Sequence, residues 1–140
     1  MDGYPFSCPI ELRYADIDAM NHVNNAIIVA YLETARLRLW QARLDFSGSA
    51  RDIPIIVARI AVDYRSPISL EDRVEIGVGV KSIGRTSFSF AYRIEASGRL
   101  AAEAESIQVN FDYANGRPIP VDDTLRARLG ALALPTNPHE

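Results

Sequence analysis

The sequence contains one cysteine, Cys8, and no long apolar run, and both scarcities limit what the protein can be. A lone cysteine excludes an internal disulfide and a metal site built from several thiolates, and its place in a predicted strand indicates a buried structural thiol. The longest apolar run, AIIVAYL at 26–32, is far shorter than the ~20 residues that cross a bilayer. The amino-terminal MDGYPFSCPIEL also lacks the basic start and apolar stretch of a signal peptide. We therefore expect a cytoplasmic protein that does not enter a membrane.

Positive charge is neither abundant nor clustered. Lys and Arg number 15 against 18 Asp and Glu, so the formal net charge is -3, and no block of like charges stands out. This pattern argues against a nucleic-acid partner. Hydrophobic residues make up 48% of the chain and charged residues 24%, which is ordinary for a globular protein. At 140 residues we expect one domain over 1–140 with a sizeable core.

Hydrophobic spacing predicts a strand, a long helix and then four strands. Residues 6–15 form a short strand, and residues 26–44 contain no Gly or Pro and place apolar side chains at helical spacing. The first two turns of this helix are apolar on all sides, which is typical of a helix enclosed by its neighbours. Beyond it, alternation predicts strands over about 56–64, 74–81, 87–95 and 100–113, and residues 122–133 indicate a short terminal helix.

The arrangement of these elements follows from the tight turns between the strands, which make neighbouring strands antiparallel. One face of the second strand carries Ile56, Ala58, Ile60, Val62 and Tyr64, and one face of the last strand carries Ile107, Val109 and Phe111. A sheet with an apolar face and one long apolar helix bury each other when the sheet curls around the helix. We predict an α+β fold, with a five-stranded antiparallel sheet wrapped around one long central helix and a short C-terminal helix.

The segment DIDAMNHVNN, residues 16–25, concentrates acids, carboxamides and a histidine directly before the long helix. A helix cap explains one asparagine, because a carboxamide accepts hydrogen bonds from free helix amides. A metal site is a second interpretation, with Asp16, Asp18 and His22 as ligands. Three ligands from one short loop are crowded, and His139 in the polar tail is a poor fourth. We therefore predict no metal.

A catalytic interpretation of the same segment uses the start of the helix. Free amides there carry partial positive charge and can polarise a carbonyl group or hold an oxyanion. A nearby carboxylate, Asp18, can attack that carbonyl or activate a water molecule against it, while the amide near Asn25 holds the oxygen. The chain has no G-x-S-x-G nucleophile motif. The reaction that this arrangement predicts is transfer of an activated acyl group, such as a thioester, to water.

The stretch RYADIDAMNHVNNAIIVAYLETAR, Arg13 to Arg36, resembles the signature of the 4-hydroxybenzoyl-CoA thioesterase group of hotdog-fold proteins. DYRSPISLEDRVEI and IGRTSFSF resemble the next two landmarks of that family, and the similarity covers about residues 8–113. The resemblance implies a hotdog fold, in which the sheet wraps the central helix. It also implies an acyl-CoA or acyl-carrier-protein thioesterase that needs no cofactor and assembles as a homodimer, often as a homotetramer.

Site residues follow from the same resemblance. Asp18 matches the catalytic aspartate, a nucleophile or general base, and Asn25 matches the position whose backbone amide points at the thioester carbonyl. His22 and Asn24 belong to the HVNN form and position water or the acyl group. Arg85 and Ser87, in GRTS, match positions that contact the coenzyme A nucleotide in some members, although Gly84 and Thr86 thin the basic cluster of the family there.

Two other functions remain open from the sequence. A hotdog enoyl-CoA hydratase or dehydratase would use Asp18 and His22 as acid and base, but the expected motif has a longer Asp-to-His spacing with Asn-Pro between them. A non-catalytic acyl-CoA-binding hotdog protein is the other alternative. The sequence leaves the acyl chain undetermined, aliphatic or aryl, and also the pathway.

Overall fold

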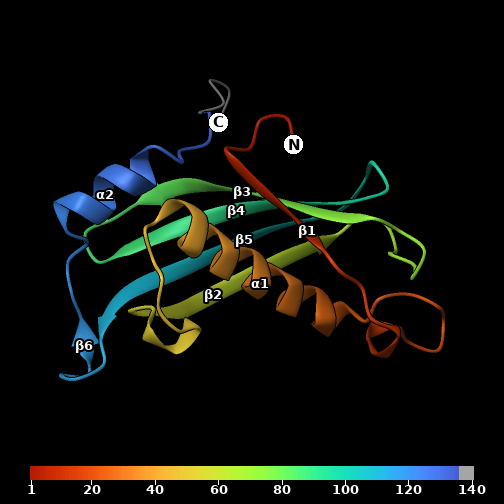
Figure 1. The fold of residues 1–140 in the computed structure, drawn as a ribbon, viewed down its shortest axis with the longest axis horizontal. Helices are drawn as coiled ribbons and strands as arrows, with labels where there is room; N and C mark the ends of the chain where they lie inside the picture. Colours follow the sequence, from red (N-terminus) through yellow and green to blue (C-terminus); the bar gives the residue numbers. More distant parts are fainter. Residues whose placement is uncertain (136–140) are drawn as a thin grey trace.

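The computed structural model describes residues 1–135 and arranges them as one sheet with a long helix across one face (Figure 1). The elements in chain order are β1 (Phe6–Ile10), η1 (Tyr14–Asp16), α1 (Asn25–Arg43), η2 (Ala50–Asp52), β2 (Ile55–Tyr64), β3 (Val74–Ile83), β4 (Ser87–Ala96), β5 (Arg99–Asp112), β6 (Arg117–Pro118) and α2 (Asp123–Gly130). The sheet order is β1–β3–β4–β5–β2, every neighbouring pair is antiparallel, and β6 pairs with β5. This confirms the predicted α+β class. His139 lies outside the described residues.

Two elements are shorter than predicted, and one short strand was not predicted. The first strand ends at Ile10 instead of residue 15, because the chain enters a 3-10 turn in which the Asp16 carboxylate accepts from the backbone amide of Arg13 at 3.1 Å. The last long strand is followed by a two-residue sixth strand, β6, which the prediction missed. The terminal helix covers Asp123–Gly130 and is shorter than the predicted 122–133.

A bulge in β2 breaks the predicted alternation of that strand. Val57 pairs with Gln108 and Arg59 with Ile107, so Ala58 has no partner on β5. The strand therefore changes face at this point, and Ile56 lies on the face opposite to Ile60, Val62 and Tyr64. The prediction of one continuous apolar face from Ile56 to Tyr64 is wrong, because an inserted residue shifts the alternation by one position.

The helix-facing side of β5 is unexpectedly polar. Ser106, Gln108 and Asn110 are buried, and the first two pair with Phe90 and Phe88 of β4. The apolar residues of β5, Ile107, Val109 and Phe111, do share one face as predicted, but it is the opposite face, where they are only partly buried.

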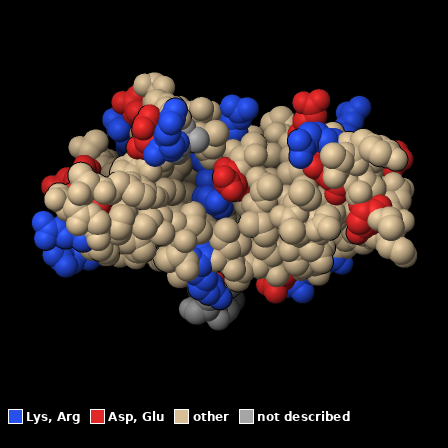
Figure 2. Space-filling view, turned by 90° about the horizontal axis from the view of Figure 1, so that it is seen from below, with Lys and Arg blue, Asp and Glu red and all other residues tan. Residues whose placement is uncertain are grey.

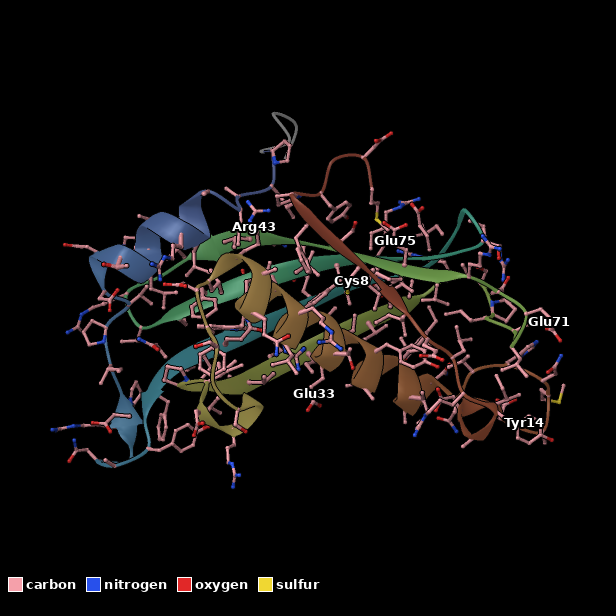
Figure 3. All side chains as sticks on the ribbon, viewed as in Figure 1. Cys8, Tyr14, Glu33, Arg43, Glu71 and Glu75 are labelled. Atoms are coloured by element: carbon pink, nitrogen blue, oxygen red, sulfur yellow. The ribbon has the colours of Figure 1, made fainter. Side chains whose placement is uncertain are left out.

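The core lies between α1 and the sheet. Buried residues of α1, among them Leu32, Ala35 and Leu39, pack over β3 and β4. The side chains completely removed from solvent include Ile76, Val78, Phe90, Ile94 and Leu132. The other side of α1 stays open, and Ala26 and Ala30 are exposed there, so within one chain the sheet covers this helix on one side only. Cys8 is a buried thiol on β1, as predicted (Figure 3).

One edge of the sheet is unpaired in the described chain. β2 pairs with β5 on one side and with no strand on the other. Large apolar side chains are exposed on it at Ile56, Val57 and Tyr64, with exposed fractions of 38%, 36% and 43%. Figure 2, viewed from the β2 side, shows a mostly uncharged surface that is hollowed near its middle. An open apolar edge is a surface that folded proteins normally cover. No helix among residues 1–135 is both long and apolar enough to cross a bilayer.

The two terminal segments cover the outer face of β3 at Gly77 and Gly79. A β-carbon on Gly79 would overlap the side chain of Leu134 and approach Pro5 to 3.1 Å. The carboxyl-terminal segment is held there by hydrogen bonds of 2.8 and 2.9 Å between Val80 and Leu132 and between Val80 and Leu134. Glycine at this position is thus needed for close approach of the two segments.

We expect Gly79→Ala to lower the free energy of unfolding by about 1–3 kcal/mol, because the added methyl group displaces the segment around Leu134. Urea denaturation of the two proteins measures the difference. Gly130→Ala is the matched control, since a β-carbon there has no atom within 4 Å. Equal losses for both variants would show that the cover over Gly79 contributes nothing.

Candidate active site

The loop between η1 and α1 folds around the side chain of Asp18. Oδ1 of Asp18 accepts hydrogen bonds from the backbone amides of Met20 at 2.9 Å and His22 at 3.1 Å. The backbone amide of Asp18 in turn donates to the carbonyl of His22 at 2.8 Å. Asn21 takes a left-handed conformation, φ 60°, which asparagine tolerates better than most residues. The carboxylate is exposed, and the loop holds it through one oxygen only.

Asn24 is the N-cap of α1, as the capping interpretation predicted. Its Oδ1 accepts from the amide of Ala26 at 2.8 Å, and its carbonyl accepts from Ile27 and Ile28. The amide of Asn25, the first residue of the helix, takes part in no hydrogen bond among the described residues. α1 has 19 residues, so this free amide stands at the positive end of a long helix.

Asp18, His22 and Asn25 line one cavity of about 410 Å³ at the start of α1. Its opposite wall comes from the end of β2 and the loop after it, with Tyr64, Arg65, Ser66, Pro67 and Ile68. The Tyr64 hydroxyl donates to the carbonyl of Asn25 at 2.9 Å, which ties the helix start to β2. The structure thus brings a residue with an exposed carboxylate and the first residue of a long helix to the same small cavity.

Asp16, the first acid of the motif, does not line this cavity. It is buried, with an exposed fraction of 2%, and its carboxylate accepts from the Tyr31 hydroxyl at 2.7 Å and from Arg13 at 3.0 Å. Burial alone would raise the pKa of Asp16, but these hydrogen bonds outweigh it and hold the pKa below its usual value. The carbonyl of Asp16 also accepts from the amide of Asn24 at 3.0 Å. Asp16 therefore fixes the loop to α1.

The loop that forms the far wall is held by Asp72. Its carboxylate accepts from Arg99 through both oxygens, at 2.7 and 3.0 Å, and from the amide of Ser69 at 2.8 Å and the hydroxyl of Ser97 at 2.9 Å. Arg99 also donates to the carbonyl of Pro67 at 2.8 Å, in the cavity wall. The Arg99 guanidinium, together with the other donors, holds the pKa of Asp72 far below its usual range.

This lowered pKa predicts acid sensitivity. Asp72 titrates near 3.9 in the unfolded chain and far lower in the folded one, so its stabilisation is present above about pH 4 and is lost as the pH falls below that value. We expect Asp72→Asn to cost about 1–3 kcal/mol of unfolding free energy at pH 7. The difference from wild type should shrink in denaturation experiments toward pH 2. Glu71→Gln, at the neighbouring exposed acid, should change neither; a constant Asp72→Asn deficit at every pH would contradict this account.

Arg85 and Ser87 lie at the opposite end of the sheet from Asp18. Ser87 pairs with Val109 of β5. The next residue of β5, Asn110, pairs with Ile55 at the start of β2, so Ser87 lies near that end of β2. The Asp18 cavity lies at the other end of β2, beside Tyr64. A ten-residue strand spans about 30 Å, so one chain does not bring the two groups together.

The residues that sequence reasoning missed are those of the far wall. The sequence pattern places Tyr64 only on the apolar face of the second strand, yet its exposed fraction is 43% and its hydroxyl donates to the carbonyl of Asn25. No local signal marks Tyr64 or the loop Ser66–Ile68, because they reach the motif only through long-range contacts such as the bond from the amide of Val23 to the carbonyl of Ile68, 2.7 Å.

Comparison with known proteins places the chain in a family. A model of the thioesterase-like superfamily matches residues 12–129. The acyl-CoA thioester hydrolase YbgC of Escherichia coli O6:H1 is 32% identical over 117 residues, which are 81% of this chain and 87% of that protein. The long-chain acyl-CoA thioesterase FadM of Escherichia coli K12 is 29% identical over 127 residues, covering 86% and 93%.

A solved structure agrees with these relatives. The thioesterase from Thermus thermophilus, in complex with coenzyme A and zinc, superposes with a TM-score of 0.85 at 35% identity, covering 94% of this chain and 96% of that one. The fold is therefore the hotdog fold of thioesterases, as the sequence resemblance implied. The chain belongs to the thioesterase-like superfamily.

Proposed function

We propose that this chain hydrolyses acyl-CoA thioesters to a carboxylic acid and free coenzyme A. One observation carries the proposal: Asp18, whose carboxylate is exposed, and Asn25, whose amide has no partner among the described residues, line the same cavity at the start of α1. The relatives named acyl-CoA thioester hydrolase and acyl-CoA thioesterase support the choice of substrate.

In the proposed reaction, the amide of Asn25 donates to the thioester carbonyl oxygen and stabilises the negative charge that develops there. Asp18 either attacks the carbonyl carbon, giving an anhydride that water then opens, or takes a proton from the attacking water. By both routes the C–S bond breaks, a C–O bond forms with the oxygen of water, and the sulfur leaves as a thiol after gaining one proton. The steps use only groups of the chain and water, with no cofactor.

The neighbouring polar residues have supporting roles in this proposal. His22 lines the cavity and is placed to orient water or the acyl group. Asn24 acts as the helix cap: its side chain accepts from the amide of Ala26, and the amide of Asn25 stays free to donate to the substrate. Their exact contributions stay predictions that the substitutions His22→Ala and Asn24→Ala test.

We further propose that two copies pair through their β2 edges into a continuous sheet. The free strand and its exposed Ile56, Val57 and Tyr64 support this surface. Pairing about a two-fold axis runs the two β2 strands antiparallel, so the Tyr64 end of one strand meets the Ile55 end of the other. Arg85 and Ser87 of one protomer then lie near Asp18 of its partner, where they can bind the coenzyme A nucleotide. Association of two dimers into a tetramer remains an expectation from the family resemblance.

The thiol-release assay tests the proposal. Purified protein is offered a panel of aliphatic and aryl acyl-CoA thioesters and the matching acyl-carrier-protein thioesters, and free thiol is followed with a chromogenic disulfide. Enoyl-CoA is offered in parallel and its hydration followed separately. Thiol release from at least one thioester is expected, and the panel also decides between the two carriers. Hydration without thiol release, or tight binding of acyl-CoA that survives unhydrolysed, would overturn the proposal. A cytoplasmic location fits an acyl-CoA substrate and stays a prediction.

A further inference from the structure

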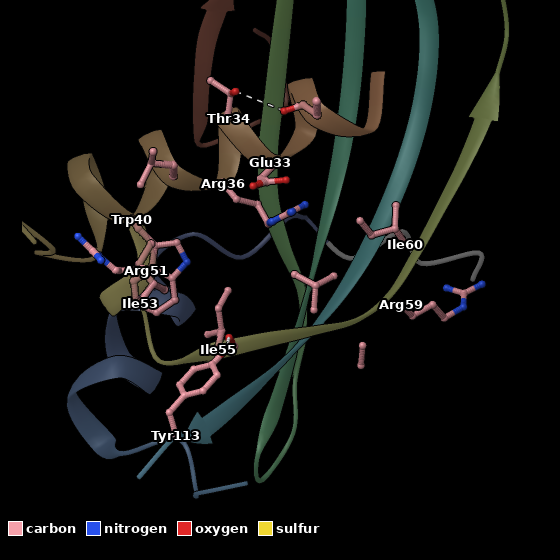
Figure 4. A pocket seen from close by; sticks show the side chains of 14 residues that line it. Glu33, Thr34, Arg36, Trp40, Arg51, Ile53, Ile55, Arg59, Ile60 and Tyr113 are labelled. Atoms are coloured by element: carbon pink, nitrogen blue, oxygen red, sulfur yellow. Dashed lines mark hydrogen bonds between the residues drawn. The ribbon is translucent and has the colours of Figure 1, made fainter. Parts of the chain in front are cut away.

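A cavity of about 810 Å³ lies between α1 and the first half of β2 (Figure 4). Its wall combines polar side chains with an apolar part that includes Leu37, Trp40, Ile53, Ile55 and Val57. The cavity lies along the free edge of β2, at the Ile55 end of that strand. In the proposed pairing this end lies beside the Asp18 cavity of the partner subunit. An acyl chain whose thioester carbonyl sits at that Asp18 would extend into this space.

A guanidinium is buried in the wall of this cavity. Arg36 projects from α1 toward the sheet, and its exposed fraction is 6% (Figure 4). No carboxylate lies within ion-pair distance of it among the described residues. Its one hydrogen bond is to the hydroxyl of Tyr92, at a long 3.4 Å. No nitrogen of Arg36 is both shut off from solvent and unpaired among the described residues, so the nitrogens that have no partner stay accessible from the cavity. The guanidinium can therefore receive an anion that enters this space.

The contacts behind Arg36 fix its direction without neutralising it. Tyr92 accepts from Arg36 and donates to Ser106 at 2.6 Å, Ser106 donates to Gln108, and Gln108 donates to the carbonyl of Phe88 at 3.1 Å. Burial raises the pKa of Tyr92, so its hydroxyl stays protonated and able to donate. This series of hydrogen bonds explains the polar inner face of β5. It uses one nitrogen of the Arg36 guanidinium, which has five N–H donors in all.

Most of the charged side chains in the cavity wall are positive. Arg36, Arg51 and Arg59 line it, against one acid, Glu33. Arg59 pairs with Glu105 at 4.0 Å, outside the wall. Glu33 is exposed, points from α1 toward the β2 side, and forms no ion pair with Arg36 (Figure 3). The cavity thus combines apolar walls with more guanidinium groups than carboxylates, and the Arg36 guanidinium belongs to a buried residue.

We propose that Arg36 binds a carboxylate at the far end of the acyl chain, so that the substrates are thioesters of dicarboxylic acids. This rests on the proposed function and on the β2 pairing described above. A carboxylate supplies the missing counter-charge and matches the planar fork of arginine with two parallel hydrogen bonds. An unsubstituted aliphatic chain would leave the guanidinium buried without a partner. Arg36 is thus a specificity-determining residue, while Tyr92 positions it.

Matched pairs of substrates test the proposal with the full chain. The pairs are glutaryl-CoA with pentanoyl-CoA, adipyl-CoA with hexanoyl-CoA and suberyl-CoA with octanoyl-CoA, compared by kcat/KM for thiol release. Wild type should prefer the carboxylated member of at least one pair by about 10-fold or more. Arg36→Met should lower kcat/KM for that member about 10- to 100-fold while changing the unsubstituted one less than about 3-fold. Arg36→Lys should keep part of the preference, because it keeps the charge without the fork.

Glu33→Gln is the control, since it removes the one acid of the wall. It should keep or strengthen the preference for the carboxylated member. Wild type that hydrolyses the unsubstituted member of every pair equally well or faster would overturn the proposal. So would an Arg36→Met variant that loses both members of a pair in equal proportion, which is the result for a purely structural arginine. If Arg36→Met does not fold, the wild-type preference and Arg36→Lys decide.

Failure of the proposed function is a separate result. If wild type releases thiol from no thioester, the function fails, and calorimetric binding of adipyl-CoA and hexanoyl-CoA decides the role of Arg36. Tighter binding of adipyl-CoA by wild type but not by Arg36→Met supports the site without hydrolysis. Equal binding of both ligands by wild type overturns it.

Discussion

Replacing Ile56 and Val57 together by aspartate is expected to separate the protein into monomers and to remove most of its thioesterase activity. Both side chains are solvent-exposed on the free edge of β2, so the protomer itself should stay folded. In a two-fold pair each substitution counts twice, and four carboxylates would meet at one interface. An unpaired charge buried in an interface costs several kcal/mol, enough to weaken the dimer about 100-fold or more. Sedimentation at micromolar protein measures the mass.

Activity follows assembly in this account because one chain keeps Asp18 and Arg85 at opposite ends of the sheet. Ala127→Asp, at an exposed position of α2 away from β2, is the control and should stay dimeric and active. A monomeric wild type with full activity would contradict the shared site. So would a double variant that stays dimeric and loses nothing.

Asp18→Asn is expected to lower kcat about 100- to 10,000-fold, because an amide neither attacks the thioester nor accepts a proton from water. The fold should persist, since Oδ1 of asparagine can still accept from the amides of Met20 and His22. We expect a stability change within about 1 kcal/mol, from the loss of a negative charge near the start of α1.

Steady-state kinetics on the fastest thioester of the panel measures this effect, and thermal unfolding checks the fold. Glu71→Gln removes a carboxylate that is exposed and lines none of the cavities described above, and it should leave kcat unchanged. A kcat of Asp18→Asn within about 3-fold of wild type would remove Asp18 from the mechanism and would leave the helix amide as the sole catalytic element of this cavity.

Local patterns were sufficient to predict the elements that bear the site. The helical spacing after Asn24 and the carboxamide that caps the helix both lie in one short stretch of sequence. α1 therefore begins within one residue of the prediction. The tight turns that join β3, β4 and β5 likewise fix the antiparallel order of these three strands. The expectation that β2 would neighbour the next strand along the chain is wrong, because β2 pairs with β5 at the edge of the sheet. Placing Asp18 and Asn25 in one cavity needed only the fact that a short loop joins them.

Long-range contacts explain what the sequence did not reveal. Apolar and polar residues still alternate before and after the bulge at Ala58, so the sequence of β2 alone does not reveal it. The bulge is seen only in the pairing of β2 with β5. The inward face of β5 was not evident from Ile107 and Val109, because Ser106 and Gln108 are inward through their bonds to Tyr92 and the carbonyl of Phe88. These partners lie 14 and 20 residues away along the chain.

Hydrolysis in water enriched with oxygen-18 tests the central claim most directly. The account predicts that, for each thiol released by wild type, the carboxylic acid gains one oxygen from water, and that Asp18→Asn forms both products at no more than about 1% of that rate. Free thiol without labelled acid would indicate transfer to another acceptor. Label at the β-carbon of an enoyl-CoA, with no thiol released, would identify a hydratase. Either result would contradict thioester hydrolysis at Asp18.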